Sequence, residues 1–528
     1  MLLAVSALAL AWVSPQNLHF DLEGDYPEAR FGSSVSTAGD VDGDGWDDLL
    51  VGAKYHSELF PDGGKAQVFS GRDGTKLFDF WGDAAEDFFG AYVNGLGDLN
   101  HDGFADFGVA AKGSDIVAEN AGMVRVFSGR DGAVLFEFFG LEAHDFFGQS
   151  FVSIGDLDLD GTADVLIGAR QSDPNRPGSG YAQVFSGASG KILFTVYGDD
   201  DYDWFGKFVG APGDIDGDGH PDFLVGAKGD DNNGTDAGMV RLFSGVDGHL
   251  LHQWDGPAGS WFGTICDAAG DVDGDGVGDI LIGAYRNNVD GKFRNGTLFV
   301  YSGADYRQLH AINGEDPFDW FSKAATALGD VDGDGCDDFA AGAYTDDNFG
   351  DKSGTVRVFS GATGMVVYTF NGRTAFDNLG YSVSAAGDVN HDGITDLLVG
   401  ARNAGIDKRG GARVFTLWTF VLHAPSVVAT GNLCKISLSG ASSNSVLVLV
   451  GGLQSGTWLL PAGILPFPAS LDIFQNNHAD WVKLTADNQG KARLWFSLPA
   501  GLSGREVLFQ AVEPSSGTVS NLTRVLVN

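Results

Sequence analysis

The sequence of 528 residues contains little cysteine and little positive charge. Its three cysteines, Cys266, Cys336 and Cys434, are too few for a disulfide framework, so each is expected to be a small buried apolar side chain. Lysine and arginine number 32 against 71 aspartates and glutamates, which gives a formal net charge of −39. Because the basic residues are scattered along the chain and phosphate binding needs a basic surface, a nucleic acid is not expected as a partner.

Long apolar runs are also missing, apart from the N-terminal segment MLLAVSALALAWVSPQ. Its apolar stretch is too short to span a bilayer, for which about 20 residues are needed. Ala9-Leu10-Ala11 fits the small-residue cleavage site of a secretory signal, although the basic residues that usually precede the apolar stretch are absent. Residues 1–16 are therefore predicted to be a signal peptide, with a buried strand as the alternative. The protein is expected to be secreted or attached to the cell surface, without a transmembrane segment.

What the sequence does contain is one acidic motif in seven copies. The first copy, DVDGDGWDD, begins at Asp40. The others begin 57 to 59 residues apart, at Asp98, Asp156, Asp214, Asp271, Asp330 and Asp388. A period this regular indicates an array of one supersecondary unit, in which no unit buries its apolar face alone.

Each unit contains four short apolar runs separated by turns rich in glycine and aspartate. In the first unit these runs lie in FGSSVSTAGD, DLLVGA, GKAQVFSG and RDGTKLFDFWG. This pattern predicts four β-strands and no helix, and motifs such as SGRDG predict tight hairpins. Four-stranded units repeated seven times around an axis form a seven-bladed β-propeller, which we predict for residues 17–420.

A linear solenoid is the alternative, but the two ends of the array argue against it. The seventh unit stops after GGARVF (410–415) and lacks its fourth strand, whereas NLHFDLEGDYPEARFG (17–32) matches KLFDFWGDAAEDFFG (76–90). The N-terminal strand is therefore predicted to complete the seventh blade and close the ring, which leaves only short edges exposed. Residues 421–528 lack the repeat, and their hairpin-like segments predict a small C-terminal β-sandwich.

Three motifs of the unit resemble FG-GAP repeats: the FG before the first strand, the DxDxDGxxD loop and the VGA that follows it. FG-GAP repeats form the blades of the N-terminal propeller of the integrin alpha subunit and occur in many bacterial surface proteins. The resemblance covers roughly residues 17–420. It implies an all-β propeller that recognises or adheres to an extracellular ligand, although a fold by itself does not determine function.

The acidic loop has the pattern of a metal site. Alternate residues of an extended loop project to one side, so Asp40, Asp42 and Asp44 are expected to converge, and they would repel one another unless a cation lay among them. With the carbonyl oxygen of Trp46, the carboxylate of Asp48 and water, the loop offers six or seven oxygen ligands, which suits Ca²⁺ better than Mg²⁺. An EF-hand is excluded because the twelfth position is an apolar β-residue instead of glutamate. An aspartate-rich turn without metal is the remaining alternative.

The seven loops have the same predicted ligand set, with side chains at positions 1, 3, 5 and 9 and a backbone carbonyl at position 7. The predicted ligands are Asp40, Asp42, Asp44, Trp46, Asp48, Asp98, Asn100, Asp102, Phe104, Asp106, Asp156, Asp158, Asp160, Thr162, Asp164, Asp214, Asp216, Asp218, His220, Asp222, Asp271, Asp273, Asp275, Val277, Asp279, Asp330, Asp332, Asp334, Cys336, Asp338, Asp388, Asn390, Asp392, Ile394 and Asp396. Up to seven Ca²⁺ ions are expected, one per blade. The two asparagines lower the charge of the second and seventh sites.

The ligand is predicted to bind on the face opposite the metal loops, and to be an extracellular protein or a glycan. That face carries the loops that vary most, such as KGDDNNGTDAG (228–238), and variable loops on a rigid scaffold are common binding sites. The loops that join successive blades present Trp204, Trp261 and Trp320 there. These side chains are expected to pack between blades, with ligand contact as the alternative.

No catalytic residue is predicted. The motifs GxSxG and HExxH are absent, and His101, His220 and His391 are expected to be solvated residues of the acidic loops. Two alternatives to a binding protein stay open: an enzyme, either hydrolase or lyase, on the same scaffold, and a purely structural envelope protein. A monomer is expected.

Overall fold

The computed structural model describes residues 18–171, 177–405 and 407–417, together with the backbone of the strands beyond residue 417. The predicted signal peptide, residues 1–16, lies outside the described residues. The chain forms two compact units, one of which runs from His19 to Leu417. In the described part of the chain we find no helix that could span a membrane.

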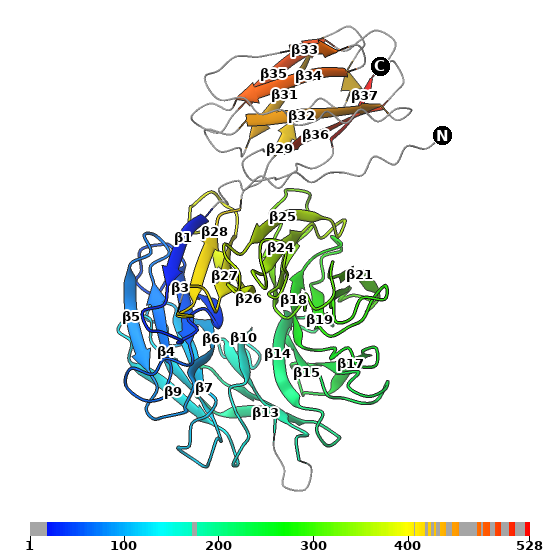
Figure 1. The fold of residues 1–528 in the computed structure, drawn as a ribbon. Helices are drawn as coiled ribbons and strands as arrows, with labels where there is room; N and C mark the ends of the chain where they lie inside the picture. The colour runs from blue at the N-terminus through cyan, green and yellow to red at the C-terminus, as the bar shows by residue number, and fades with distance from the viewer. Residues whose placement is uncertain are drawn as a thin grey trace. The chain divides into compact units, whose positions relative to one another are not determined.

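The unit from His19 to Leu417 is a ring of seven four-stranded sheets, the blades of a β-propeller (Figure 1). The predicted all-β, seven-bladed fold is therefore confirmed. Blade one contains β2 (Ser34–Gly39), β3 (Asp48–Ala53), β4 (Lys65–Phe69) and β5 (Lys76–Trp81). Blade two contains β6 (Phe89–Gly97), β7 (Asp106–Ala111), β8 (Met123–Phe127) and β9 (Val134–Phe139). Blade three contains β10 (Ser150–Gly155), β11 (Asp164–Ala169), β12 (Tyr181–Phe185) and β13 (Ile192–Tyr197).

The other four blades repeat this order. Blade four contains β14 (Phe205–Gly213), β15 (Asp222–Ala227), β16 (Met239–Phe243) and β17 (Leu250–Asp255). Blade five contains β18 (Ile265–Gly270), β19 (Asp279–Ala284), β20 (Thr297–Tyr301) and β21 (Gln308–Asn313). Blade six contains β22 (Ala325–Gly329), β23 (Asp338–Ala343), β24 (Thr355–Phe359) and β25 (Val366–Asn371). Blade seven contains β26 (Leu379–Gly387), β27 (Asp396–Ala401), β28 (Gly411–Phe415) and β1 (Leu18–Glu23).

Close contact between neighbouring blades explains the glycines of the FG and VGA motifs. A Cβ atom on Gly52 of β3 would lie 2.1 Å from the carbonyl oxygen of Gly90 in the next blade, so no larger residue fits there without a shift of the backbone. The same contact joins the last blade to the first, since a Cβ atom on Gly400 would lie 2.0 Å from the carbonyl oxygen of Gly32. The repeat therefore encodes the interface that closes the ring.

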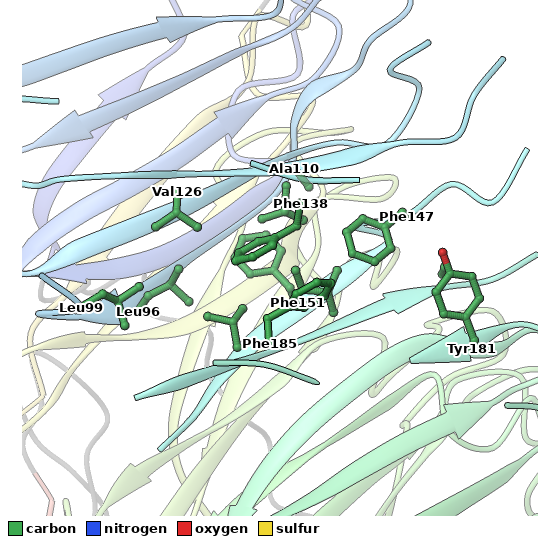
Figure 2. Packing of buried hydrophobic residues seen from close by; sticks show 13 residues of the cluster. Leu96, Leu99, Ala110, Val126, Phe138, Phe147, Phe151, Tyr181 and Phe185 are labelled. Atoms are coloured by element: carbon green, nitrogen blue, oxygen red, sulfur yellow. The ribbon is translucent and has the colours of Figure 1, made fainter. Parts of the chain in front are cut away.

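Apolar side chains of adjacent blades form the core of the propeller. Figure 2 shows the cluster between blades two and three, in which Leu96, Val126 and Phe138 of blade two meet Phe151 and Phe185 of blade three. The rings of Phe138 and Phe185 lie 4.3 Å apart between centroids. Full burial of one such side chain stabilises a fold by about 1.5–3 kcal/mol. Because these contacts join different blades, each blade depends on its neighbours for stability.

The N-terminal strand closes the ring, as predicted. β1 is the outermost strand of blade seven, next to β28 (Figure 1). Phe20 and Leu22 of β1 pack against the core cluster that blades seven and one share. The guanidinium Nε of Arg413, a residue with a side chain only 5% exposed, lies 3.2 Å from Oδ1 of Asp21. Apolar packing and a largely buried ion pair therefore both hold β1 on the ring.

The strands beyond residue 417 form two further sheets in the second unit. One sheet contains β29 (Val421–His423), β31 (Leu433–Ser439) and β35 (Ala492–Ser497). The other contains β30 (Val427–Val428), β37 (Thr523–Val527), β36 (Glu506–Val512), β32 (Val446–Leu453), β34 (Ala479–Thr485) and β33 (Ile473–Asn476). Two sheets are what the predicted β-sandwich requires.

Candidate metal centres

The seven acidic loops join the first and second strands of each blade, so they share one face of the propeller. Each loop is folded by bonds to its own carboxylates. In the first loop, the N–H of Gly45 donates to Oδ2 of Asp40 at 2.9 Å, and the N–H of Trp46 donates to Oδ1 of Asp44 at 3.0 Å. These two bonds recur in the other six loops. The loops therefore have one common conformation.

Glycine at position 6 is required by the backbone of this loop. Gly45 has φ of +91°, and its six counterparts have φ between +88° and +98°. A Cβ atom on Gly45 would meet nothing within 4 Å, so the left-handed conformation, and not a lack of space, selects glycine. This tight bend brings the alternate carboxylates of the loop to one side.

The loops bring carboxylates close enough to share a cation. In loops one, three and five, oxygen atoms from positions 1, 3 and 9 lie within 4.8 Å of one another, and in loop four those from positions 1, 3 and 5 do. These groups are Asp40, Asp42 and Asp48; Asp156, Asp158 and Asp164; Asp271, Asp273 and Asp279; and Asp214, Asp216 and Asp218. Carboxylate oxygens in such number suit a hard divalent cation, which would also offset their mutual repulsion.

The aspartate at position 9 is buried and ties each loop to the rest of its blade. Asp48 accepts one hydrogen bond from the N–H of Val41 at 2.9 Å and another from the N–H of Gly71 at 3.0 Å. Burial raises the pKa of Asp48 to about 7, and burial likewise raises the pKa of its six counterparts to values from about 6 to about 8. A carboxylate that has lost this much hydration is stabilised by a nearby positive charge.

The other predicted ligands lie in the same loops. Oδ1 of Asn100 accepts the N–H of Asp102 at 2.9 Å, and Oδ1 of Asn390 accepts that of Asp392 at 2.9 Å. Asparagine thus replaces the position-3 aspartate without changing the loop, and it only lowers the charge. The carbonyl oxygens of position 7 stay predicted ligands.

The sequence did not predict the contacts between neighbouring acidic loops. His101 Nε2 lies 3.0 Å from Oγ1 of Thr162 in the next loop, and the ring of His391 stacks on Trp46 at 3.9 Å between centroids. His220 Nδ1 lies 2.7 Å from a carbonyl oxygen of the preceding loop. His101 and His391 are exposed and His220 is half-buried, in agreement with the expected solvation, but each also contacts a neighbouring loop of the ring.

Arginine side chains also contact two of the loops, and Nη1 of Arg72 lies 3.8 Å from Oδ2 of Asp44 in loop one. Nη2 of Arg307 lies 2.6 Å from Oδ2 of Asp273 in loop five. The position of Arg307 after the hairpin of blade five gives no sequence signal for this contact. The guanidinium already neutralises part of that loop, so a cation in loop five would compete with it.

A further acidic cluster lies on the opposite face, where Asp199, Asp203 and Asp230 bring oxygen atoms within 4.8 Å of one another. The acidic run DDDYD (199–203) was the available sequence signal. Burial, followed by the charge of Asp230, raises the pKa of Asp203 to about 7. Nη2 of Arg241 lies 2.6 Å from Oδ2 of Asp199, so the guanidinium of Arg241 already neutralises part of this cluster.

The same face carries a cavity of about 480 Å³ in the centre of the ring, lined by the first strands of the blades. Cys266 lies in this lining and is buried, as predicted. Cys336 is half-buried in loop six and is not in a disulfide. Cys434 lies outside the residues whose side chains the structure describes.

Comparison with known proteins identifies the repeat. The FG-GAP repeat family matches residues 31–69, 147–185, 209–243, 324–359 and 379–416. Integrin alpha-V of Gallus gallus is 29% identical over 244 residues, which cover 42% of this chain and 23% of the integrin. Integrin alpha-5 of Xenopus laevis is 30% identical over 222 residues, which cover 39% of this chain and 20% of the integrin. Integrin alpha-8 of Gallus gallus is 26% identical over 302 residues, which cover 51% and 28%.

These matches span between a fifth and about a quarter of the length of the integrin chains. A solved structure of the N-terminal domain of a Streptococcus gordonii adhesin aligns over 98% of both chains, but its TM-score of 0.16 and identity of 8% support no argument. The family matches fall on the blades, and those that begin at residues 31 and 147 include both the FG motif and the glycine of the second strand. Five segments of the chain therefore match the FG-GAP repeat, and its propeller is similar to the integrin alpha subunits.

Proposed function

We propose that this protein is a calcium-stabilised propeller that recognises or adheres to a ligand outside the cell. The observation that carries the proposal is the recurrence of one carboxylate loop in every blade, with oxygen atoms within 4.8 Å of one another in four of the loops. The similarity to integrin alpha subunits supports the recognition role. In the proposal, a signal peptide of residues 1–16 precedes the propeller, and residues 421–528 form a separate module of a monomeric protein.

Calcium is the proposed ion because of the donors and the flexibility of the loop. Ca²⁺ takes six to eight oxygen ligands in flexible geometry, whereas Mg²⁺ demands an octahedron and gives up its waters reluctantly. Each loop would hold the ion with the side chains of positions 1, 3, 5 and 9 and the carbonyl of position 7. The bonds from the backbone to positions 1 and 5 already hold these side chains in place without metal.

The recognition role predicts that the loops opposite the metal loops carry binding. Replacing residues 229–237 of blade four by a short Gly-Ser turn should weaken ligand binding at least tenfold, because it removes side chains from that face only. Binding to glycan arrays and immobilised extracellular proteins is compared for wild type, the loop variant and Val246→Ser, an exposed hairpin residue on the metal-loop face. Val246→Ser should bind like wild type. Unchanged binding by this loop variant and by equivalent variants of the other blades would contradict the proposed location.

An enzyme on the same scaffold is the second candidate, and one residue of the central cavity favours it. Burial alone would raise the pKa of Tyr381, but the charges of Lys323, Lys54 and Arg402 lower it to about 7. The Lys323 Nζ and the Arg402 Cζ each lie 3.8 Å from the centroid of the Tyr381 ring. A phenol that ionises near neutral pH is suited to act as a general base.

The enzyme candidate predicts product from an acidic polysaccharide such as polygalacturonate. A hydrolase would release reducing ends, and a lyase would also create a carbon–carbon double bond that absorbs ultraviolet light. Tyr381→Phe should abolish either signal, since it removes the ionisable hydroxyl and keeps the ring. Product formation by Tyr381→Phe at the wild-type rate would exclude Tyr381 as the base, and no product from wild type would leave the binding role as the better proposal.

A further inference from the structure

The central cavity is lined mainly by basic side chains, although the chain as a whole is strongly acidic. Its lining contains five basic side chains and one acidic side chain: Lys54, Lys112, Lys207, Lys323, Arg402 and Asp267. The chain as a whole has more than twice as many acidic as basic residues. Lys54, Lys112 and Arg402 each directly follow the second strand of their blade, at the end opposite the metal loop. The repeat therefore gathers basic residues from distant parts of the sequence at one end of the ring.

The expectation that the basic residues are scattered is therefore wrong for the folded protein. Arg170 and Lys228 occupy the same position after the second strand in blades three and four, and Arg286 lies one residue further along in blade five. Electrostatic coupling extends around this group, since the charges of Lys228 and Arg170 both lower the pKa of Lys207. The cavity is thus the centre of a basic ring in an otherwise acidic protein.

These cations have no carboxylate partners. Over residues 18–171, 177–405 and 407–417, neither the five basic residues of the cavity nor the three at its rim form an ion pair. The Nε atoms of Arg170, Arg286 and Arg402 are buried without any hydrogen-bond partner. Lys228 is buried and the other seven cations are half-buried. Charges that are partly removed from water without an opposite charge are destabilising, and an anionic ligand would provide the missing partners.

A continuous run of aromatic rings lies beside the cations. Successive ring centroids from Trp261 through Tyr285, Trp320 and Tyr344 to Tyr381 are separated by 5.6, 5.9, 5.5 and 5.2 Å. Tyr285, Tyr344 and Tyr381 also line the cavity. The run passes from the edge of blade five to blade seven, so it forms an extended apolar surface along the basic ring.

The two tryptophans of this run have a strained backbone. Trp261 and Trp320 have φ of +55° and +50°, in the left-handed region that bulky residues rarely adopt. Both pack on the tyrosines, in agreement with the predicted packing between blades, and both stay half-buried. The residue at this position has a positive φ in every blade, so the left-handed conformation belongs to the repeat and is not specific to these tryptophans. The cation of Arg286 lies 3.2 Å from the centroid of Trp261, so charge and ring surface meet at the rim.

We propose that this cavity binds an acidic polysaccharide, a chain of sugars that carry carboxylate or sulfate groups. The inference rests on the proposed recognition function and names the class of its ligand. Lysine and arginine form charge-assisted hydrogen bonds to carboxylate and sulfate oxygens. Cations lie over Trp261 at 3.2 Å and over Tyr381 at 3.8 Å, so sugar rings would pack on the apolar surface of the three rings between them, Tyr285, Trp320 and Tyr344. An acidic peptide would satisfy the cations but has no repeating ring to place along these aromatic side chains.

The cavity should bind anions more tightly as the pH falls from about 8 to about 6. Burial, together with Lys228, Arg170 and Lys112, lowers the pKa of Lys207 to about 6, so this amine gains its charge at the acidic end of the range. Burial raises the pKa of Asp267 to about 6, so this carboxylate begins to lose its negative charge over the same range.

The remaining ionisable groups of the cavity act in the same direction. Burial, followed by Lys54 and Arg170, lowers the pKa of Lys112 to about 8, and this amine also becomes charged as the pH falls. Tyr381, with a pKa of about 7, loses its negative charge. Burial lowers the pKa of Lys323 as well. The positive charge of the cavity therefore increases at each step from pH 8 to pH 6.

The test is calorimetric titration of the full-length protein in Ca²⁺ with four probes: a galacturonate oligosaccharide, dextran sulfate, neutral dextran and poly-glutamate. Wild type should bind the galacturonate oligosaccharide and dextran sulfate, more tightly at pH 6 than at pH 8, and should not bind neutral dextran. The double variant Lys323→Met/Arg402→Met should bind them roughly tenfold more weakly or worse, because two charge-assisted bonds are lost. Its melting temperature should equal or exceed that of wild type, because the variant removes two half-buried cations that have no carboxylate partner.

A double variant of equal charge change serves as the control. Lys76→Met/Lys191→Met alters the start of β5 and the turn before β13, far from the cavity, and should bind like wild type. Tyr285→Leu should weaken binding of the saccharides while leaving any binding of poly-glutamate unchanged. Equal affinity of wild type and Lys323→Met/Arg402→Met, or tighter binding of poly-glutamate than of either saccharide, would overturn the proposal. Calcium-dependent melting without binding of any saccharide would overturn this inference alone and leave the proposed calcium-stabilised propeller standing.

Discussion

Removal of calcium with excess EDTA should lower the melting temperature of the protein by more than about 10 °C. A site that is filled at a hundred times its dissociation constant stabilises the folded state by about 2.7 kcal/mol. Four such sites contribute about 11 kcal/mol to one cooperative ring. For a ring of about 400 residues the unfolding entropy is about 0.8 kcal/mol/K, so the expected shift is roughly 13 °C.

The measurement is thermal melting in EDTA, in Ca²⁺ and in Mg²⁺, with bound metal counted after dialysis. Mg²⁺ should restore little of the lost stability. Asp271→Ala should lower the metal count by one and destabilise blade five, since Asp271 is at position 1 of loop five and accepts the N–H of Gly276. Asp131→Ala, in the exposed hairpin of blade two, should leave both the metal count and the melting curve unchanged. Identical curves in EDTA and Ca²⁺, or fewer than about four ions per chain, would contradict the metal role of the loops.

Features with a local cause were predictable from the sequence. Gly52 and Gly90 belong to sequence motifs because the same close contact between neighbouring blades recurs around the ring and admits only glycine. The acidic loop could be predicted because the bonds to its position-1 and position-5 aspartates run between residues at most five positions apart, as between Asp40 and Gly45. The closure of the ring could be predicted because the seventh unit lacks its fourth strand and an extra strand, β1, precedes the first unit.

Features created by the ring itself were not predictable in the same way. Lys54 and Lys112 are 58 residues apart and look isolated in an acidic sequence, but the ring places them around one cavity. The periodicity that revealed the metal loops was also present in these residues, but a single charge per unit is a weak signal beside four carboxylates. His101 and Thr162 likewise meet only because consecutive blades lie side by side. Contacts between blades at single residues therefore needed the structure.

Deletion of residues 1–23 should destabilise the propeller and cause self-association. The deletion removes β1 and leaves β28 as an unpaired edge, and exposed strand edges pair with other chains. It also uncovers the apolar surface beneath Phe20 and Leu22 and takes the carboxylate of Asp21 away from the largely buried Arg413. Arg413 keeps its ion pair with Asp377 at 3.2 Å, so the loss of Asp21 removes one charge-assisted hydrogen bond, which costs about 1.5–3 kcal/mol and corresponds to roughly 2–4 °C for a ring of this size before any loss of apolar packing.

A synthetic peptide of residues 17–25 provides the matched control for the deletion. It should bind the truncated protein by adding its strand to β28, restore the melting temperature and suppress self-association. The same peptide with Asp21→Lys should restore much less, because its lysine would face the guanidinium of Arg413. Melting and light scattering are measured in Ca²⁺, so that loss of metal does not contribute. If the truncated protein melts like wild type and stays monomeric, β1 is dispensable and the remaining contacts of blades seven and one, such as that of Gly400 with Gly32, are enough to close the ring.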